Sequence, residues 1–127
     1  MTTKPLHYLS IGEASRLIKD RSLSPVELTT AFLHRIEALD PKLRAYITVT
    51  ADLALRQAEQ AEAELSAGRY RGPLHGIPIA LKDLFDTAGV ATTSGSRLFA
   101  DRIPRADGTV AARLREAGAV LLGKLAM

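Results

Sequence analysis

The sequence has 127 residues, of which 46% are hydrophobic and 24% are charged, which is typical of a globular protein with one aliphatic core. The net charge is +3, but the basic residues are scattered along the chain, and this distribution argues against a nucleic-acid-binding surface. The chain contains no cysteine, so disulfides and thiolate chemistry are excluded.

The amino-terminal stretch MTTKPLHYLS lacks the apolar segment of a secretory signal. No apolar run approaches the length needed to cross a bilayer. The absence of cysteine fits a reducing compartment. We therefore expect a cytoplasmic protein that does not bind a membrane.

Two helices are expected in the first 40 residues. Ser10 is a good N-cap for a short helix. A second start signal follows at Ser24 and Pro25, with Glu27 three positions after the serine, which is the capping-box pattern. We expect Asp40 and Pro41 to end this second helix, because proline cannot continue a helix. The expected apolar faces are Ile11, Ala14, Leu17 and Ile18, and then Leu28, Phe32, Ile36 and Leu39.

A strand and a third helix come next. Residues 45–49 are rich in β-branched and aromatic side chains and predict a short strand. Residues 52–67 predict a helix that ends before Gly68. Its expected buried stripe consists of Ala54, Ala58, Ala61 and Leu65.

The second half of the chain predicts a strand, a long loop, a helix and another strand. Pro78 argues for an edge strand, or for the first residue of a strand. Asp107 is expected to cap a helix that Gly118 ends. Residues 119–122 predict a buried strand, and because no closing element follows it we expect this strand to be uncovered.

These elements predict an α/β fold with residues 1–68 mainly helical and residues 69–127 forming the start of an α/β core. We expect 1–127 to be one part of a single domain. Neither a repeat nor a low-complexity segment interrupts the sequence.

The motifs do not predict a metal or a cofactor. His7, His34 and His75 lie far apart without ligand spacing, and ordinary surface or packing roles are expected for them. No phosphate-binding loop pattern occurs. The hydroxyl-rich segment 92–96 lacks the pattern of a nucleophile elbow, and we expect a solvated turn there.

Lys82 allows two interpretations. It follows the apolar run 77–81, so it could simply close a strand and extend into water. It could instead be partly buried so that its amine gives up a proton and acts as a base. Asp83 and Asp86 would oppose this second role, because nearby negative charge favours the protonated amine.

The motif GPLHGIPIALKD at residues 72–83 resembles the amidase signature hydrolases. The resemblance extends over essentially the whole chain, although the helical part alone would not carry it. The further matching residues are Gly89, Thr92, Thr93, Gly95, Ser96, 117–124, 24–28, Arg35 and Ile36.

The resemblance implies a mixed β-sheet of the amidase signature fold, preceded by helices, and a Ser–cis-Ser–Lys triad that hydrolyses carboxylic amides through an acyl-enzyme. It implies that Lys82 is the catalytic base, with no cofactor or metal. In that family both serines lie downstream, beyond Met127, and Ser94 and Ser96 match a threonine-rich loop instead. We therefore expect 1–127 to be a truncated amino-terminal part that is inactive alone.

Two alternatives remain open. The chain could be a non-enzymatic fragment or depend on a partner, with association through the 119–122 strand. Within the enzyme class, it could be the amidase subunit of a tRNA-dependent amidotransferase. The substrate expected for the complete enzyme is a small-molecule amide.

Overall fold

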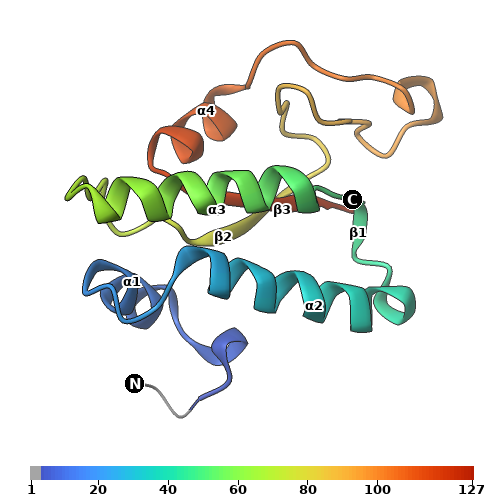
Figure 1. Ribbon diagram of the computed structural model, residues 1–127. Coiled ribbons are helices and arrows are strands. Elements are labelled where there is room, and N and C mark those ends of the chain that lie inside the picture. Colours follow the sequence, from blue (N-terminus) through green and yellow to red (C-terminus); the bar gives the residue numbers. More distant parts are fainter. Residues whose placement is uncertain (1–3) are drawn as a thin grey trace.

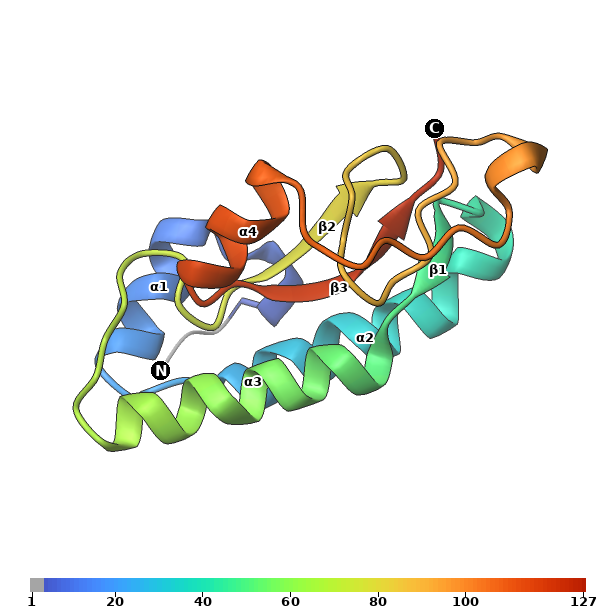
Figure 2. The same cartoon turned by 90° about the horizontal axis from the view of Figure 1, so that it is seen from above.

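The computed structural model describes residues 4–127, which form a small sheet with helices on both faces (Figures 1 and 2). Two long helices, α2 and α3, lie side by side against one face of the sheet, and α4 lies on the opposite side. In chain order the elements are η1 (Leu6–Tyr8), α1 (Ile11–Lys19), α2 (Pro25–Leu43), β1 (Tyr46–Val49), α3 (Ala51–Ser66), β2 (Pro78–Lys82), η2 (Arg97–Phe99), α4 (Thr109–Glu116) and β3 (Val120–Leu125).

The sheet is mixed and has the strand order β1-β3-β2. Strand β3 pairs antiparallel with β1 and parallel with β2. The expectation of an uncovered strand at 119–122 is therefore wrong. Residues 119–122 are buried, and β3 has a hydrogen-bonded neighbour on each side. Pro78 begins the edge strand β2, as expected, because proline lacks the N–H that a central strand needs.

Ser10 and Ser24 cap α1 and α2 as predicted, but among the described residues the reciprocal capping-box bond is made at α1, by Glu13, and not by Glu27 at α2 as expected. The Ser10 hydroxyl accepts from the backbone N–H of Glu13, and the Glu13 carboxylate accepts from the backbone N–H of Ser10. The Ser24 hydroxyl accepts the backbone N–H groups of Val26 and Glu27. These bonds satisfy donors that have no partner inside the helix.

The predicted end of α2 is wrong by a few residues. Helix α2 includes Pro41 and runs to Leu43. Pro41 lies in the last turn, where a missing N–H costs one hydrogen bond and leaves the rest of the helix intact. The chain then turns at Arg44, which has φ 50°, and the Asp40 carboxylate accepts from the backbone N–H of Ala45 at 2.8 Å.

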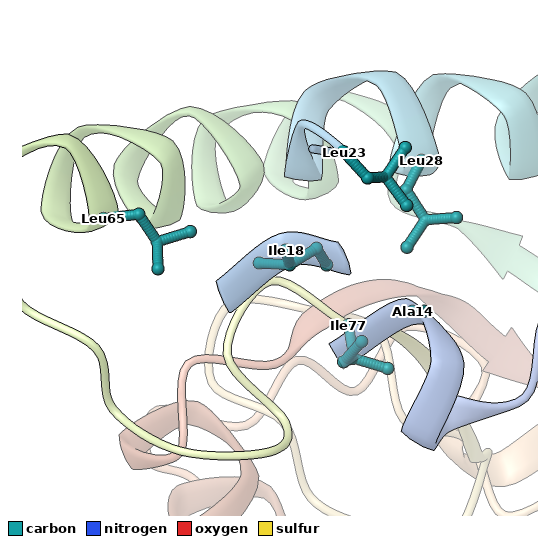
Figure 3. Close-up of a cluster of buried hydrophobic side chains, with 6 residues drawn as sticks. All are labelled: Ala14, Ile18, Leu23, Leu28, Leu65 and Ile77. Atoms are coloured by element: carbon teal, nitrogen blue, oxygen red, sulfur yellow. The ribbon is translucent and has the colours of Figure 1, made fainter. Parts of the chain in front are cut away.

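The core joins the helices to the sheet in three clusters. The predicted stripe of α3 is confirmed, since Ala54, Ala58, Ala61 and Leu65 are all buried. Ala54 and Ala58 pack against Val120 and Leu122 of β3. One further cluster joins β2 and β3 to α4 through Leu81, Leu121 and Ala111. Figure 3 shows the cluster beside α1, which consists of Ala14, Ile18, Leu23, Leu28, Leu65 and Ile77.

Helix α4 is not capped by Asp107, contrary to the expectation from the sequence. Its N-cap is Gly108, and no side chain caps it. The Asp107 carboxylate instead accepts from the backbone N–H of Ala88 at 2.8 Å and pairs with Arg115 at 2.9 Å. Asp107 therefore connects the long loop to the far end of α4 rather than starting the helix.

Candidate functional site

Lys82 is the last residue of β2, at the edge of the sheet. Its side chain is exposed, and its Nζ donates a hydrogen bond to the carbonyl oxygen of Ala126 at 3.1 Å. Of the two interpretations of Lys82, this position matches the accessible end of a strand.

Asp83 follows Lys82 directly and is completely buried. Its carboxylate accepts the backbone N–H of Thr93 at 3.1 Å and also the Thr93 hydroxyl. Its own backbone N–H donates to Leu125 at 3.0 Å, and its carbonyl accepts from Ser94 at 2.8 Å. A buried carboxylate needs such partners, because leaving it unpaired costs several kcal/mol. The residue after Lys82 is thus fixed from both sides.

The expectation of a solvated turn at 92–96 is wrong for its first two residues. Thr92 and Thr93 are buried, whereas Ser94 is exposed and has φ 52°. The Thr92 hydroxyl donates to Val90, and the Thr93 hydroxyl donates to Asp83. The segment is therefore half polar core and half turn.

Lys124 is the polar residue that the sequence reasoning missed. It lies in the central strand β3, and its side chain is completely buried. Its Nζ donates to the carbonyl oxygen of Phe85 at 2.8 Å and to the Thr92 hydroxyl at 2.7 Å. The available signal was a lysine inside the apolar strand sequence VLLGKL, since lysine is rarely buried without partners.

Both negatively and positively charged side chains act on Lys124. Burial lowers the pKa of Lys124, and the carboxylates of Asp83 and Asp86 oppose this effect by favouring the charged amine. Asp86 is paired with Arg102 through two hydrogen bonds of 2.8 Å. These bonds hold the pKa of Asp86 below its ordinary value. The buried polar side chains beside the end of β2 are thus Asp83, Thr92, Thr93 and Lys124, whereas the Lys82 side chain is exposed and bonds to Ala126.

His75 takes part in a separate polar network. Its ring is completely buried, and its Nδ1 accepts the backbone N–H of Arg71 at 3.1 Å. Its Nε2 therefore carries the proton and donates to Glu64 at 3.1 Å. Arg71 donates to the other oxygen of Glu64 at 2.6 Å. Each nitrogen of the ring is occupied, so His75 has a packing role, and the network ties the turn before β2 to α3.

The part of the chain that the structure describes, residues 4–127, holds no group of three or more His, Asp or Glu side chains placed to bind a metal ion. The same residues include no helix long and apolar enough to cross a membrane. The candidate site is Lys82 at the end of β2, next to the buried polar side chains of Asp83, Thr92, Thr93 and Lys124.

Comparison with known proteins gives a consistent result. The family model described as Amidase matches residues 27–127. A glutamyl-tRNA(Gln) amidotransferase subunit of Moorella thermoacetica is 48% identical over 122 residues, covering 96% of this chain and 25% of that protein. The protein named putative amidase AmiD of Mycobacterium bovis is 47% identical over 119 residues, covering 94% of this chain and 25% of its own length.

Comparison with solved structures also finds similarity to amidases. Native peptide amidase from Stenotrophomonas maltophilia superposes with a TM-score of 0.89 at 41% identity, covering 95% of this chain and 25% of that one. The chain thus spans about a quarter of the length of the relatives that it matches. The matched structures also support the mixed α/β fold expected from the sequence.

Proposed function

Because this chain belongs to the amidase family, we propose that it contributes to an amidase-type hydrolase, which cleaves the C–N bond of a carboxylic amide. The observation that supports the proposal is the position of Lys82. It is an accessible amine at the end of a strand, followed immediately by a buried and fully paired carboxylate. The hydrogen bonds of Asp83 hold the backbone at the end of β2 in place, and so they set the point from which the Lys82 side chain extends.

In this proposal Lys82 is the general base. A neutral lysine amine accepts the proton of a hydroxyl nucleophile, and that hydroxyl attacks the amide carbonyl carbon. The protonated Lys82 then returns this proton to the leaving nitrogen as the tetrahedral adduct expels ammonia or an amine. Water adds to the acyl-enzyme and releases the carboxylic acid and the hydroxyl group. Within the described residues Lys82 Nζ donates to a backbone carbonyl, and the nucleophile is proposed to come from a serine outside 1–127.

The domain organisation expected from the sequence remains part of the proposal. We assign residues 1–127 to the amino-terminal part of one amidase domain, with 1–68 mainly helical. The isolated chain is then expected to be inactive, because triad members act as a unit and a base alone contributes little. The cytoplasmic location also stays a prediction.

A chimera provides the test of this function. Residues of this chain would replace the aligned quarter of the Stenotrophomonas maltophilia peptide amidase, and ammonia release from a panel of carboxamides would be measured. We expect activity that falls by roughly 10²- to 10⁴-fold in Lys82→Met, which is the usual contribution of a general base. Lys42→Met, which removes a lysine from the exposed surface of α2, is the matched control.

Full activity of the Lys82→Met chimera would contradict the proposed role of Lys82. A folded chimera without any amide hydrolysis would contradict the proposed function itself. Hydrolysis of simple amides by 1–127 alone, lost in Lys82→Ala, would overturn the expected inactivity of this chain.

A second candidate is the amidase subunit of a tRNA-dependent amidotransferase. It is favoured by relatives such as a glutamyl-tRNA(Gln) amidotransferase subunit of Geobacter metallireducens, which is 51% identical over 117 residues. Both functions break an amide C–N bond, so Lys82 has the same proposed role in each. Ammonia release from glutamine, compared with simple carboxamides, separates them. A partner-dependent chain without catalysis is the outcome if neither substrate is hydrolysed.

A further inference from the structure

Large apolar side chains are exposed along the loop that follows β2. They are Leu84, Leu98, Phe99 and Ile103, and Leu98, in η2, keeps 90% of its surface open to solvent. A single exposed leucine is ordinary on a protein surface. A group of such side chains on one loop is instead typical of a surface that another polypeptide covers.

The carboxy end of the chain lies beside this loop. A Cβ on Gly95 would come within 3.4 Å of the Met127 side chain, so Met127 packs over the turn that leads into η2. Figures 1 and 2 show η2 (orange) and the carboxy terminus at the same end of the molecule, away from the amino terminus. Met127 is itself exposed. We call Leu84, Leu98, Phe99, Ile103 and Met127 the apolar patch.

The apolar patch adjoins the candidate base. Lys82 Nζ donates to the carbonyl oxygen of Ala126, the residue before Met127. On the other side of Lys82, Leu84 follows two residues later in the sequence. A polypeptide that covers the apolar patch would therefore lie next to the Lys82 amine.

Polar contacts hold the loop that carries the patch. The backbone N–H of Thr92 donates to the carbonyl oxygen of Arg102 at 3.0 Å, and the Arg102 guanidinium pairs with Asp86. The buried amine of Lys124 bonds to Phe85 and to Thr92. Because these contacts already order the loop, docking onto it would lose little conformational entropy. The exposed apolar side chains are thus presented by a fixed part of the fold.

The length of the relatives indicates what covers the patch. This chain matches about a quarter of each relative, so three quarters of an amidase domain have no counterpart in 1–127. In the proposed function the nucleophilic serine belongs to that remaining part, and it must come within reach of the Lys82 amine. The apolar patch has the position that this requirement sets.

We propose that the apolar patch is the docking surface for the remaining three quarters of an amidase domain. The inference rests on the proposed function, because that function places the nucleophile outside 1–127. Docking at the patch covers Leu98 and its neighbours with apolar side chains and brings the nucleophile to Lys82.

The test compares Leu98→Gln in 1–127 alone with the same substitution in the chimera with the Stenotrophomonas maltophilia peptide amidase. In 1–127 the Leu98 side chain is in water, so the Tm should be unchanged. In the chimera the side chain should be buried, and the Tm should fall by about 2 °C or more. Tyr8→Gln is the matched control, since Tyr8 is exposed in η1, near the other end of the molecule. An unchanged Tm of the Leu98→Gln chimera, or an equal loss in Tyr8→Gln, would overturn the proposal.

Amide hydrogen exchange tests the same surface without a substitution. Residues 97–103 should exchange roughly tenfold more slowly in the chimera than in 1–127, because local opening then also requires undocking. Residues 6–8 should exchange at the same rate in both. Unprotected residues 97–103 in a folded chimera would contradict the proposal. A chimera that does not fold would contradict it as well, since a complementary surface should complete the domain.

Sedimentation of 1–127 tests whether a second copy of this chain covers the patch instead. We expect a monomer, because the proposed partner is the rest of an amidase domain. A stable dimer that Leu98→Gln dissociates would assign the patch to self-association and would overturn the proposal.

Tm and exchange rates do not depend on catalysis, so they separate this inference from the proposed function. A folded chimera that protects residues 97–103 but hydrolyses no amide would contradict the function and support the docking surface. A Lys82-dependent chimera that is indifferent to Leu98→Gln would contradict only the docking surface.

Discussion

The ring of His75 lies directly against Gly118, so closely that a Cβ on Gly118 would come within 2.5 Å of His75 Cδ2. The contact joins the turn before β2 to the turn before β3, and the backbone N–H of Gly76 also donates to the carbonyl of Gly118 at 2.9 Å. Both turns lead into the paired strands that carry Lys82 and Lys124. The contact thus fixes the start of the strand pair whose other end is the candidate site.

Gly118→Ala should strongly destabilise the fold. Gly118 has φ 83°, which costs a side chain about 1–2 kcal/mol, and the new methyl group would also displace the buried His75. We expect a loss of about 3 kcal/mol or more in the free energy of unfolding, measured with urea. Gly68→Ala is the matched control, since Gly68 has φ 79° and open space around it. Equal losses in the two variants would show that the His75 contact contributes nothing.

Glu64→Gln should remove a pH-dependent part of the stability. Burial raises the pKa of Glu64, but the hydrogen bonds from Arg71 and His75 outweigh it, so the pKa is lowered overall. A lowered pKa stabilises the folded state above the unfolded value of about 4.3, and this stabilisation is lost as the pH falls through the folded value. The stability difference between the original chain and Glu64→Gln should therefore be largest near neutral pH and shrink in acid. Urea unfolding at several pH values measures it, with Glu59→Gln on the exposed side of α3 as the control.

Thr29→Val should stabilise the protein. Thr29 is completely buried in α2, and within the described residues its hydroxyl has no hydrogen-bond partner. Valine has nearly the same shape without the polar atom, so the unfolding free energy of the variant should be about 1 kcal/mol higher. Thr29→Ser, which keeps the hydroxyl and removes the methyl group, should be less stable than the original. A destabilising Thr29→Val would indicate that the hydroxyl is satisfied in solution.

Asp83→Ala should be among the most damaging substitutions at the candidate site. It leaves the backbone N–H and hydroxyl of Thr93 without an acceptor and removes a counter-charge from buried Lys124. Removing one partner from a buried network costs about 3–5 kcal/mol, and we expect a loss in this range by thermal or urea unfolding. The control is Asp101→Ala at an exposed position. A loss no larger than that of the control would argue against a fixed loop after Lys82.

The elements with strong local signals were predicted well from the sequence. The caps at Ser10 and Ser24 and the alanine stripe of α3 depend on residues a few positions apart, and each is confirmed. Pro41 and Asp107 were assigned wrongly because their local signals were overridden. Pro41 fits in a last helical turn, and Asp107 is used by the distant groups Ala88 and Arg115.

The central position of β3 could not be read from the sequence. Pairing with β1 and with β2 depends on tertiary contacts, whereas the apolar pattern at 119–122 indicates only burial. The same limit explains why the buried residues next to the candidate site could be predicted only in part. Lys82 was predicted from its motif, but the partners of Lys124 come from residues 85 and 92, which sequence spacing does not connect to it. The role of Lys82 as a base stays a prediction.

The position of β3 in the sheet has a consequence for how the chain folds. During synthesis β1 and β2 emerge first, yet each pairs with β3, so neither can complete its hydrogen bonds until residues 120–125 have been made. The alanine face of α3 likewise cannot be buried against the sheet until Val120 and Leu122 have been made. Pairing over such long sequence separations is slow and leaves apolar surface exposed in the meantime. The helices therefore leave the ribosome with an open apolar face, and the sheet assembles in a later step.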